Sequence, residues 1–97
     1  MEISKVDENG TVTLKLKGCL DTAATADFAA ALESAIQAKA IVLEMGELEF
    51  IASSALRLLV TTRKRRGNDF PIALVGMNEV VREVFDVTGL DEVFEIR

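Results

Sequence analysis

Two neighbouring serines, Ser53 and Ser54, are the side chains of this 97-residue chain best placed to do chemistry. They follow a short apolar segment and precede apolar residues that recur at helical spacing from Leu56 onward. A serine at the start of a helix can cap the first turn, which stabilises the helix by about 1 kcal/mol, and in α/β sheets function concentrates at the junctions between strands and helices. Both roles require a helix that begins at this point.

The residues that are absent exclude most enzyme classes. With no histidine in the chain, a Ser-His-Asp triad, a histidine general base and every histidine-containing metal site are ruled out. The single cysteine, Cys19, can form neither an internal disulfide nor a CxxC pair, and we expect a buried or half-buried, inert thiol. The six glycines form neither a GxGxxG nor a Walker-type loop. We therefore expect a binding protein without a cofactor, not an enzyme.

Charge and composition restrict the classes of partner that the chain is expected to bind. The 16 acidic residues outnumber the 11 basic ones, and the chain has no Trp or Tyr, so nucleic acid is not expected as a partner. No apolar run approaches the roughly 20 residues of a membrane span, and the first residues do not resemble a signal peptide. These features predict a soluble, cytoplasmic protein that does not bind membranes.

Two charged groups could suggest additional sites. Glu44, Glu47 and Glu49 could suggest a magnesium site, but alternating acids beside a surface loop are more typical of a solvated face, so no metal is assigned. The basic run 63–66 closes a predicted helix, where cations oppose the helix dipole. We interpret it as a capping and solubility feature that could also contact an acidic partner.

The chain is predicted to open with a β-hairpin. Val12, Leu14 and Leu16 alternate with polar residues across 11–17, as in a strand with one buried face. The preceding Asn9-Gly10 favours the positive φ angles of a tight turn, so residues 2–8 should pair antiparallel as an edge strand.

A helix and a buried strand should follow. Asp21 and Thr22 can cap the helix. Residues 40–43 form an apolar run without alternation, which is typical of a central parallel strand buried on both faces. The apolar stripe predicted for the helix consists of Phe28, Leu32, Ala35 and Ile36.

The second half repeats the alternation of helix and strand. The helix that starts at the serines should run to Arg66 and end at Gly67-Asn68. A strand over 70–75 follows, and then a third helix lies between an Asn78 cap and a Gly89 stop, with Val81, Val84 and Phe85 buried. A last strand is predicted over 92–96. The order predicts an α/β fold over residues 1–97 as one domain: a mixed, mostly parallel sheet with helices packed against it.

The sequence resembles the STAS domain family, and within it the bacterial anti-sigma factor antagonists. The resemblance spans nearly the whole chain and depends on four segments in matching order and spacing. These are Gly18-Cys19-Leu20-Asp21, Ile41-Val42-Leu43, the segment from Leu48 to Leu56, and Val84-Phe85-Asp86-Val87-Thr88-Gly89-Leu90.

The resemblance implies a regulatory switch. The family carries a D-S-S-G motif at the start of the second helix, and its first serine, which matches Ser53, accepts the phosphate. The unphosphorylated domain binds an anti-sigma factor that is also its serine kinase, and phosphorylation breaks the complex. The implied partner-binding residues are Asp21, Ala52, Ser54, Ala55 and Arg57. A phosphatase and a second copy of this chain are further partners consistent with the resemblance.

The sequence departs from the family motif at two positions. Ala52 stands where the family has Asp, which removes a carboxylate that could cap the helix or position the acceptor hydroxyl. Ala55 stands where the family has Gly; alanine favours a helix by about 1 kcal/mol, but its methyl group can obstruct close approach. The alternative to the switch is therefore a STAS module that is not phosphorylated and binds constitutively, as a scaffold or as a subunit of a signalling complex.

Overall fold

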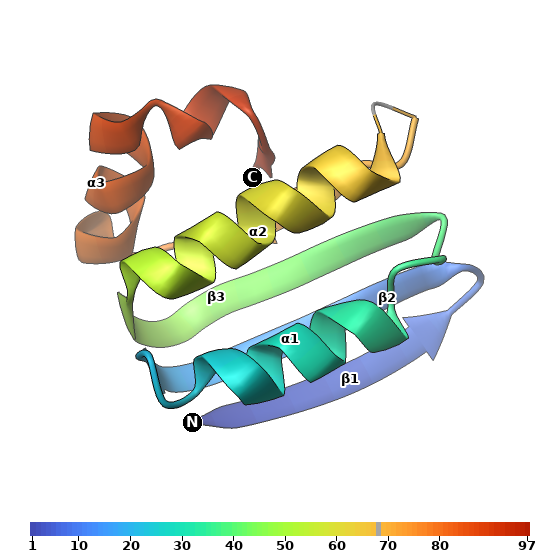
Figure 1. Cartoon of the computed structure of the whole chain (residues 1–97), viewed down its shortest axis with the longest axis horizontal. Helices are drawn as coiled ribbons and strands as arrows, with labels where there is room; N and C mark the ends of the chain where they lie inside the picture. Colours follow the sequence, from blue (N-terminus) through green and yellow to red (C-terminus); the bar gives the residue numbers. More distant parts are fainter. Residues whose placement is uncertain (68) are drawn as a thin grey trace.

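A computed structural model describes residues 1–67 and 69–97 (Figure 1). In chain order its elements are β1 (Glu2–Glu8), β2 (Thr11–Leu20), α1 (Thr25–Ser34), β3 (Ala40–Ile51), α2 (Ser53–Arg66), β4 (Ile72–Val75), α3 (Glu79–Thr88), the single 3-10 turn η1 (Leu90–Glu92) and β5 (Glu95–Ile96). Gly67 is the C-cap of α2, as predicted, whereas Asn68 lies outside the described residues.

The strands form one sheet in the order β1-β2-β3-β4-β5, in which only β1 is antiparallel to its neighbour. The predicted hairpin is confirmed: Asn9 and Gly10 have φ angles of 53° and 84°, so both residues adopt the left-handed conformation that a tight turn requires. Helices α1 and α2 lie side by side on one face of the sheet (Figure 1). The α/β class with a mixed, mostly parallel sheet is therefore confirmed.

Only the face of the sheet under the helices is fully buried. Val12, Leu14 and Leu16 of β2 lie in the core, while Lys15 and Lys17 between them are exposed, as the alternation predicts. The prediction for the next strand was wrong in two respects. β3 continues for 12 residues, to Ile51, and its second face is not fully buried, since Val42 is half-buried and Glu44 is exposed. The strand is longer because its pairing with β2 continues to Ile51. Its second face is less buried because α1 and α2 pack on the other face.

Two arginines near the end of α2 connect it to α1. Arg66 is only 6% exposed, and its guanidinium donates to the backbone oxygens of Ala35, Ile36 and Phe70. Burial, with a smaller contribution from Arg63, lowers the pKa of Arg66. Arg65 makes a two-bond contact with Glu33 of α1, at 2.9 and 3.3 Å. The basic run thus anchors the C-terminal end of α1 to α2, and it also opposes the dipole of α2.

The last third of the chain contains less regular secondary structure than predicted. β4 begins at Ile72 and not at Phe70, whose side chain is exposed. The predicted strand over 92–96 was wrong over most of its length: η1 ends at Glu92, and β5 contains two residues. Gly89 ends α3 at a φ of 76°, as expected for a left-handed C-cap. Among the described residues, no helix is long and apolar enough to cross a membrane.

Candidate functional site

The candidate site lies where β2 and β3 end and α1 and α2 begin. Because β2 and β3 are parallel, their carboxyl ends meet at the same edge of the sheet, as in other parallel sheets whose loops carry function. The Ala52 N–H donates to the Leu20 oxygen at 2.8 Å, which holds the start of α2 against the end of β2. Asp21 follows Leu20 and Ser53 follows Ala52, so this contact brings together two residues that are 32 positions apart in sequence.

Ser53 is the first residue of α2, and its side chain is exposed. The predicted N-cap role of the serines was wrong: the N-cap is Ala52, in an extended conformation, and no side chain among the described residues caps the helix. The chain enters the helix one residue earlier than the serine pattern suggests. The hydroxyl of Ser53 forms no hydrogen bond with any described residue, and the side chain is exposed, so the hydroxyl is accessible at the helix start.

The first turn of α2 keeps two backbone donors free. Ala55 and Leu56 donate their N–H groups to the Ala52 oxygen, both at 3.1 Å. The N–H groups of Ser53 and Ser54 have no acceptor among residues 1–67 and 69–97. Free N–H groups at the positive end of a helix dipole form a favourable environment for an anion.

Ser54 connects the two helices. Its hydroxyl lies 3.1 Å from the Thr25 hydroxyl, which in turn donates to the Asp21 backbone oxygen at 3.0 Å. Since a hydroxyl has one hydrogen and Thr25 uses its own on Asp21, Ser54 is the donor to Thr25. This contact distinguishes Ser54 from Ser53, whose hydroxyl has no partner among the described residues.

The Asp21 carboxylate is exposed at the same edge. It accepts a hydrogen bond from the Ala24 N–H at 2.9 Å, so it caps the turn before α1. The prediction that Asp21 and Thr22 cap the helix itself was wrong, because α1 starts at Thr25 and its N-cap, Ala24, lies three residues after Asp21 and two after Thr22. One carboxylate oxygen of Asp21 remains available for another contact.

The remaining predicted site residues differ in exposure. Arg57 is exposed, one helical turn after Ser53, and its guanidinium pairs with none of the described residues. Ala52 is half-buried, whereas Ala55 is 0% exposed and lies in the hydrophobic core. Ala55 therefore packs beneath the exposed predicted site residues and contributes no accessible surface. We use the name serine junction for Asp21, Ala52, Ser53, Ser54 and Arg57.

Sequence reasoning missed an exposed aromatic residue beside the serine junction. Phe50 is 50% exposed near the end of β3 and pairs in register with Cys19 of β2, whose thiol is also exposed. The prediction of a buried thiol was wrong. An irregularity in the pairing between Gly18 and Cys19 accompanies this arrangement. The alternation along β2 was the available signal, because Cys19 continues the exposed positions Lys15 and Lys17.

The acidic residues of β3 do not gather into a cation site. Glu44, Glu47 and Glu49 are all exposed, and Glu47 forms a loose ion pair with Lys15 at 3.9 Å. In the part of the chain that the structure describes, no group of three or more acidic or cysteine side chains is arranged to hold a metal ion. The chemistry available at the serine junction is that of a hydroxyl beside free N–H groups.

Comparison with known proteins agrees with this geometry. The family model described as STAS domain matches residues 2–97. The anti-sigma-F factor antagonist RsfB of Mycobacterium tuberculosis is 29% identical over 100 residues, covering 97% of this chain and 79% of that protein.

Two solved structures share the fold. One is an anti-sigma factor antagonist from Mycobacterium paratuberculosis, with a TM-score of 0.89 and 22% identity, covering 98% of this chain and 83% of that one. The other is the Bacillus cell fate determinant SpoIIAA in its phosphorylated form, with a TM-score of 0.76 and 22% identity, covering 99% and 91%. With the family model matching nearly its full length, the chain belongs to the STAS domain family.

Proposed function

We propose that this protein is an anti-sigma factor antagonist that binds an anti-sigma factor of the kinase type and is switched by phosphorylation of Ser53. The observation that carries the proposal is the exposed, unbonded Ser53 hydroxyl at the uncapped start of α2 in a STAS domain. The relatives named as anti-sigma factor antagonists, and the phosphorylated state named for one of them, support it. The protein acts in the cytoplasm as a regulator of transcription and not as an enzyme.

The phosphorylated form is physically reasonable in the free domain. A phosphate on Ser53 adds about −1.5 to −2 charges, and the free N–H groups of Ser53 and Ser54 and the helix dipole favour that charge. Arg57 lies four residues later on the same helix face, a spacing at which an anion and a cation attract. Phosphorylation should therefore leave the domain folded.

The same phosphate would oppose a closed interface. In a complex that covers the serine junction, the charged group would lose its water, and it would add to the negative charge of the neighbouring Asp21 carboxylate. Release of the partner then follows from repulsion and desolvation at the surface. No rearrangement of the core is needed, and a phosphatase would restore binding by removing the charge.

A constitutive scaffold is the second candidate function. It is favoured by one observation: Ala52, the N-cap of α2, has no side-chain oxygen with which to position the Ser53 hydroxyl or to contact the kinase. In this alternative the serine junction binds its partner without covalent control. A second copy of the chain would be one such partner.

Binding assays on three variants separate the candidates. Calorimetry with the purified kinase anti-sigma factor of the host should give wild-type affinity for Ser53→Ala, no phosphate incorporation into that variant, and at least about tenfold weaker binding of Ser53→Asp. Ser54→Ala is the control, and it should still be phosphorylated. Phosphate incorporation that persists in Ser53→Ala, or full affinity in Ser53→Asp, would contradict the switch.

A further inference from the structure

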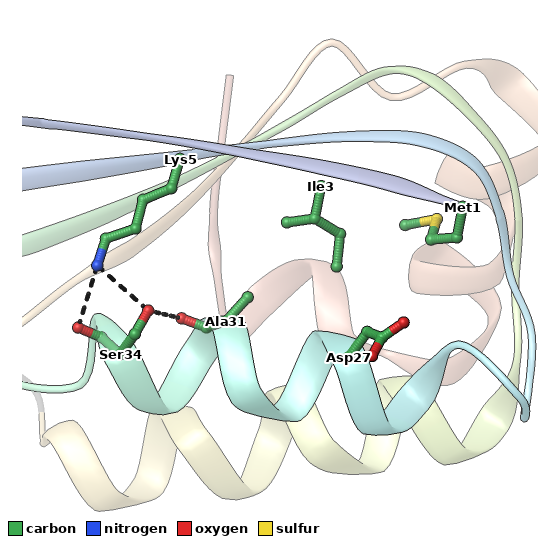
Figure 2. A pocket seen from close by; sticks show the side chains of 6 residues that line it. All are labelled: Met1, Ile3, Lys5, Asp27, Ala31 and Ser34. Atoms are coloured by element: carbon green, nitrogen blue, oxygen red, sulfur yellow. Dashed lines mark hydrogen bonds between the residues drawn. The ribbon is translucent and has the colours of Figure 1, made fainter.

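A groove separates α1 from the edge strand β1 (Figure 2). Ile3 of β1 and Ala31 of α1 point toward one another across it, and Met1 and Asp27 lie at one end. At the other end, Lys5 donates to the Ser34 hydroxyl at 3.3 Å and to its backbone oxygen at 3.5 Å, as Figure 2 shows. The groove is therefore closed by a hydrogen-bonded pair at one end and open at the other.

The sequence explains why these two elements do not close onto each other. Asp27, Ala31 and Ser34 share one face of α1, at positions i, i+4 and i+7, and all three are small or polar. On β1, Ile3 and Lys5 face the helix layer, because they pair with the buried Leu16 and Leu14 of β2. With Ile3 as the one aliphatic side chain of that pair, α1 has little on β1 against which to pack.

The open end of the groove carries an acidic side chain and adjoins a second hollow. The Asp27 carboxylate forms no hydrogen bond or ion pair with any described residue. Met1 and Asp27 also line the second hollow, which is lined by Cys19 and Asp21 as well. The groove and a hollow beside the serine junction therefore meet at Met1 and Asp27.

The dimensions suit a short extended peptide. The seven steps along α1 from Asp27 to Ser34 span about 10 Å, and the four steps along the chain from Met1 to Lys5 span about 13 Å. These lengths correspond to three or four residues of an extended chain at roughly 3.3 Å each. Alternate side chains of such a chain are about 6.6 Å apart, close to the helical turn of about 6 Å that separates Asp27 from Ala31.

We propose that this groove receives an extended segment of the partner protein. A Lys or Arg of the segment lies against Asp27, and an aliphatic side chain two residues away packs against Ile3 and Ala31. The inference rests on the proposed function in one respect: the partner is the protein that docks on the serine junction, whose Asp21 lines the hollow next to the groove. The groove would thus add recognition of partner sequence to a contact that phosphorylation controls.

Nuclear magnetic resonance titration of the whole domain tests the groove directly. The probe is the capped pentapeptide Ala-Arg-Ala-Leu-Ala, added at concentrations up to the millimolar range because so short a ligand binds weakly. We expect saturable shifts of the Ile3, Asp27 and Ala31 amides. The matched peptide with Glu in place of Arg should bind about fivefold more weakly or not at all.

Matched variants on α1 sharpen the test. Ala31→Leu fills the groove and should weaken binding of the Arg peptide by about tenfold, whereas Ala30→Leu, the exposed neighbour, should leave it unchanged. Should Ala31→Leu disturb the fold, Asp27→Asn gives the same information, with Glu83→Gln of α3 as its control. Asp27→Asn should weaken binding of the Arg peptide and Glu83→Gln should retain it, and neither variant should change the circular dichroism spectrum.

Several results would overturn the inference. Shifts that do not saturate, shifts confined to the opposite face of the sheet, or equal affinities for the Arg and Glu peptides would each exclude this recognition. Shifts at the same amides that depend on protein concentration without peptide would show that a second copy occupies the groove instead. Ser53→Asp should bind the peptide as the wild type does, so failure of the switch and failure of the groove are distinguishable.

Discussion

Helices α2 and α3 begin in opposite ways, although both follow a strand of the same sheet. The N-cap of α3 is Asn78, whose side chain accepts from the Val81 N–H at 2.9 Å and donates to the Leu48 oxygen at 3.0 Å. The N-cap of α2 is Ala52, which has no polar side chain. The start of α3 is capped by a side chain, whereas the start of α2 has no side-chain cap among the described residues.

We interpret the difference as one between a structural junction at α3 and the proposed functional junction at α2. Asn78 satisfies its helix and ties α3 to β3, so it contributes to stability and leaves little to offer a ligand. At α2, the bond from Ala52 to Leu20 and that from Ser54 to Thr25 fix the position of the turn. The hydroxyl and N–H of Ser53 remain free within that fixed frame, which is the arrangement a regulated acceptor needs.

The largest effect on stability should come from Asn78. Asn78→Ala removes a helix cap and leaves the Leu48 oxygen without its partner, so we expect a loss of about 2 kcal/mol. Ser53→Ala removes no hydrogen bond to a described residue and should change stability by less than about 0.5 kcal/mol. Urea denaturation followed by circular dichroism measures both. Equal losses for the two variants would mean that the contrast between the helix starts is wrong.

A side-chain cap on α2 should reduce the contrast. Ala52 already has the extended backbone of an N-cap, at φ −79° and ψ 157°, so Ala52→Asp should stabilise the domain by about 1 kcal/mol. It also restores the carboxylate of the family motif, and we expect faster phosphorylation of Ser53. Thermal melts and incorporation of labelled phosphate provide the two readouts. No change in stability would show that another group already satisfies the first turn.

A negative charge at the first position of α2 should have a smaller effect, and one that stabilises. Ser53→Asp places a carboxylate at the positive end of the helix dipole, worth about 0.5 kcal/mol at low salt. Its melting temperature should rise slightly and the gain should shrink in high salt. A marked fall would show that this variant loses partner binding by unfolding, and the binding test of the switch would then need phosphoserine itself.

The smallest predicted effect concerns the pair between α1 and α2. The hydrogen bond and the charge of Arg65 lower the pKa of Glu33 below its ordinary value. Since the folded-state pKa lies below the unfolded one, the stabilisation is complete above the unfolded pKa and is lost as the pH falls through the folded one. Melting temperatures of the wild type and Glu33→Gln should differ slightly at neutral pH and converge in acid. A difference independent of pH would point to packing instead.

Much of the fold could be predicted because local signals and tertiary packing agree. Asn9-Gly10 sets the hairpin, Asn78 and Gly89 bound α3, and the alternation along β2 gives its buried face. The errors fall where the two disagree. The acids of β3 indicated a loop, but pairing with β2 extends the strand to Ile51. The residue pattern within one segment cannot reveal how far its pairing with a neighbouring strand continues.

The sequence correctly predicts that the serines lie at the start of α2, but some details of the geometry there were wrong, and the functional role of this place stays a prediction. The serines marked the start of α2, but their residue type predicted a cap where the backbone makes Ala52 the N-cap. A shift of one residue decides whether the Ser53 hydroxyl is used or free, and helix boundaries are known from sequence only to within a few residues. The burial of Ala55 and the exposure of Phe50 depend on packing between distant segments, which a residue pattern does not contain.

Mass spectrometry of the protein from its native host would test whether the free hydroxyl of Ser53 is a phosphorylation switch. The protein would be captured during growth and under stress, with phosphate mapped to individual residues and bound proteins identified. We predict phosphate on Ser53 whose level changes with condition, and an anti-sigma factor that co-purifies only with the unmodified form. Unmodified Ser53 in every condition, with the partner still bound, would contradict it.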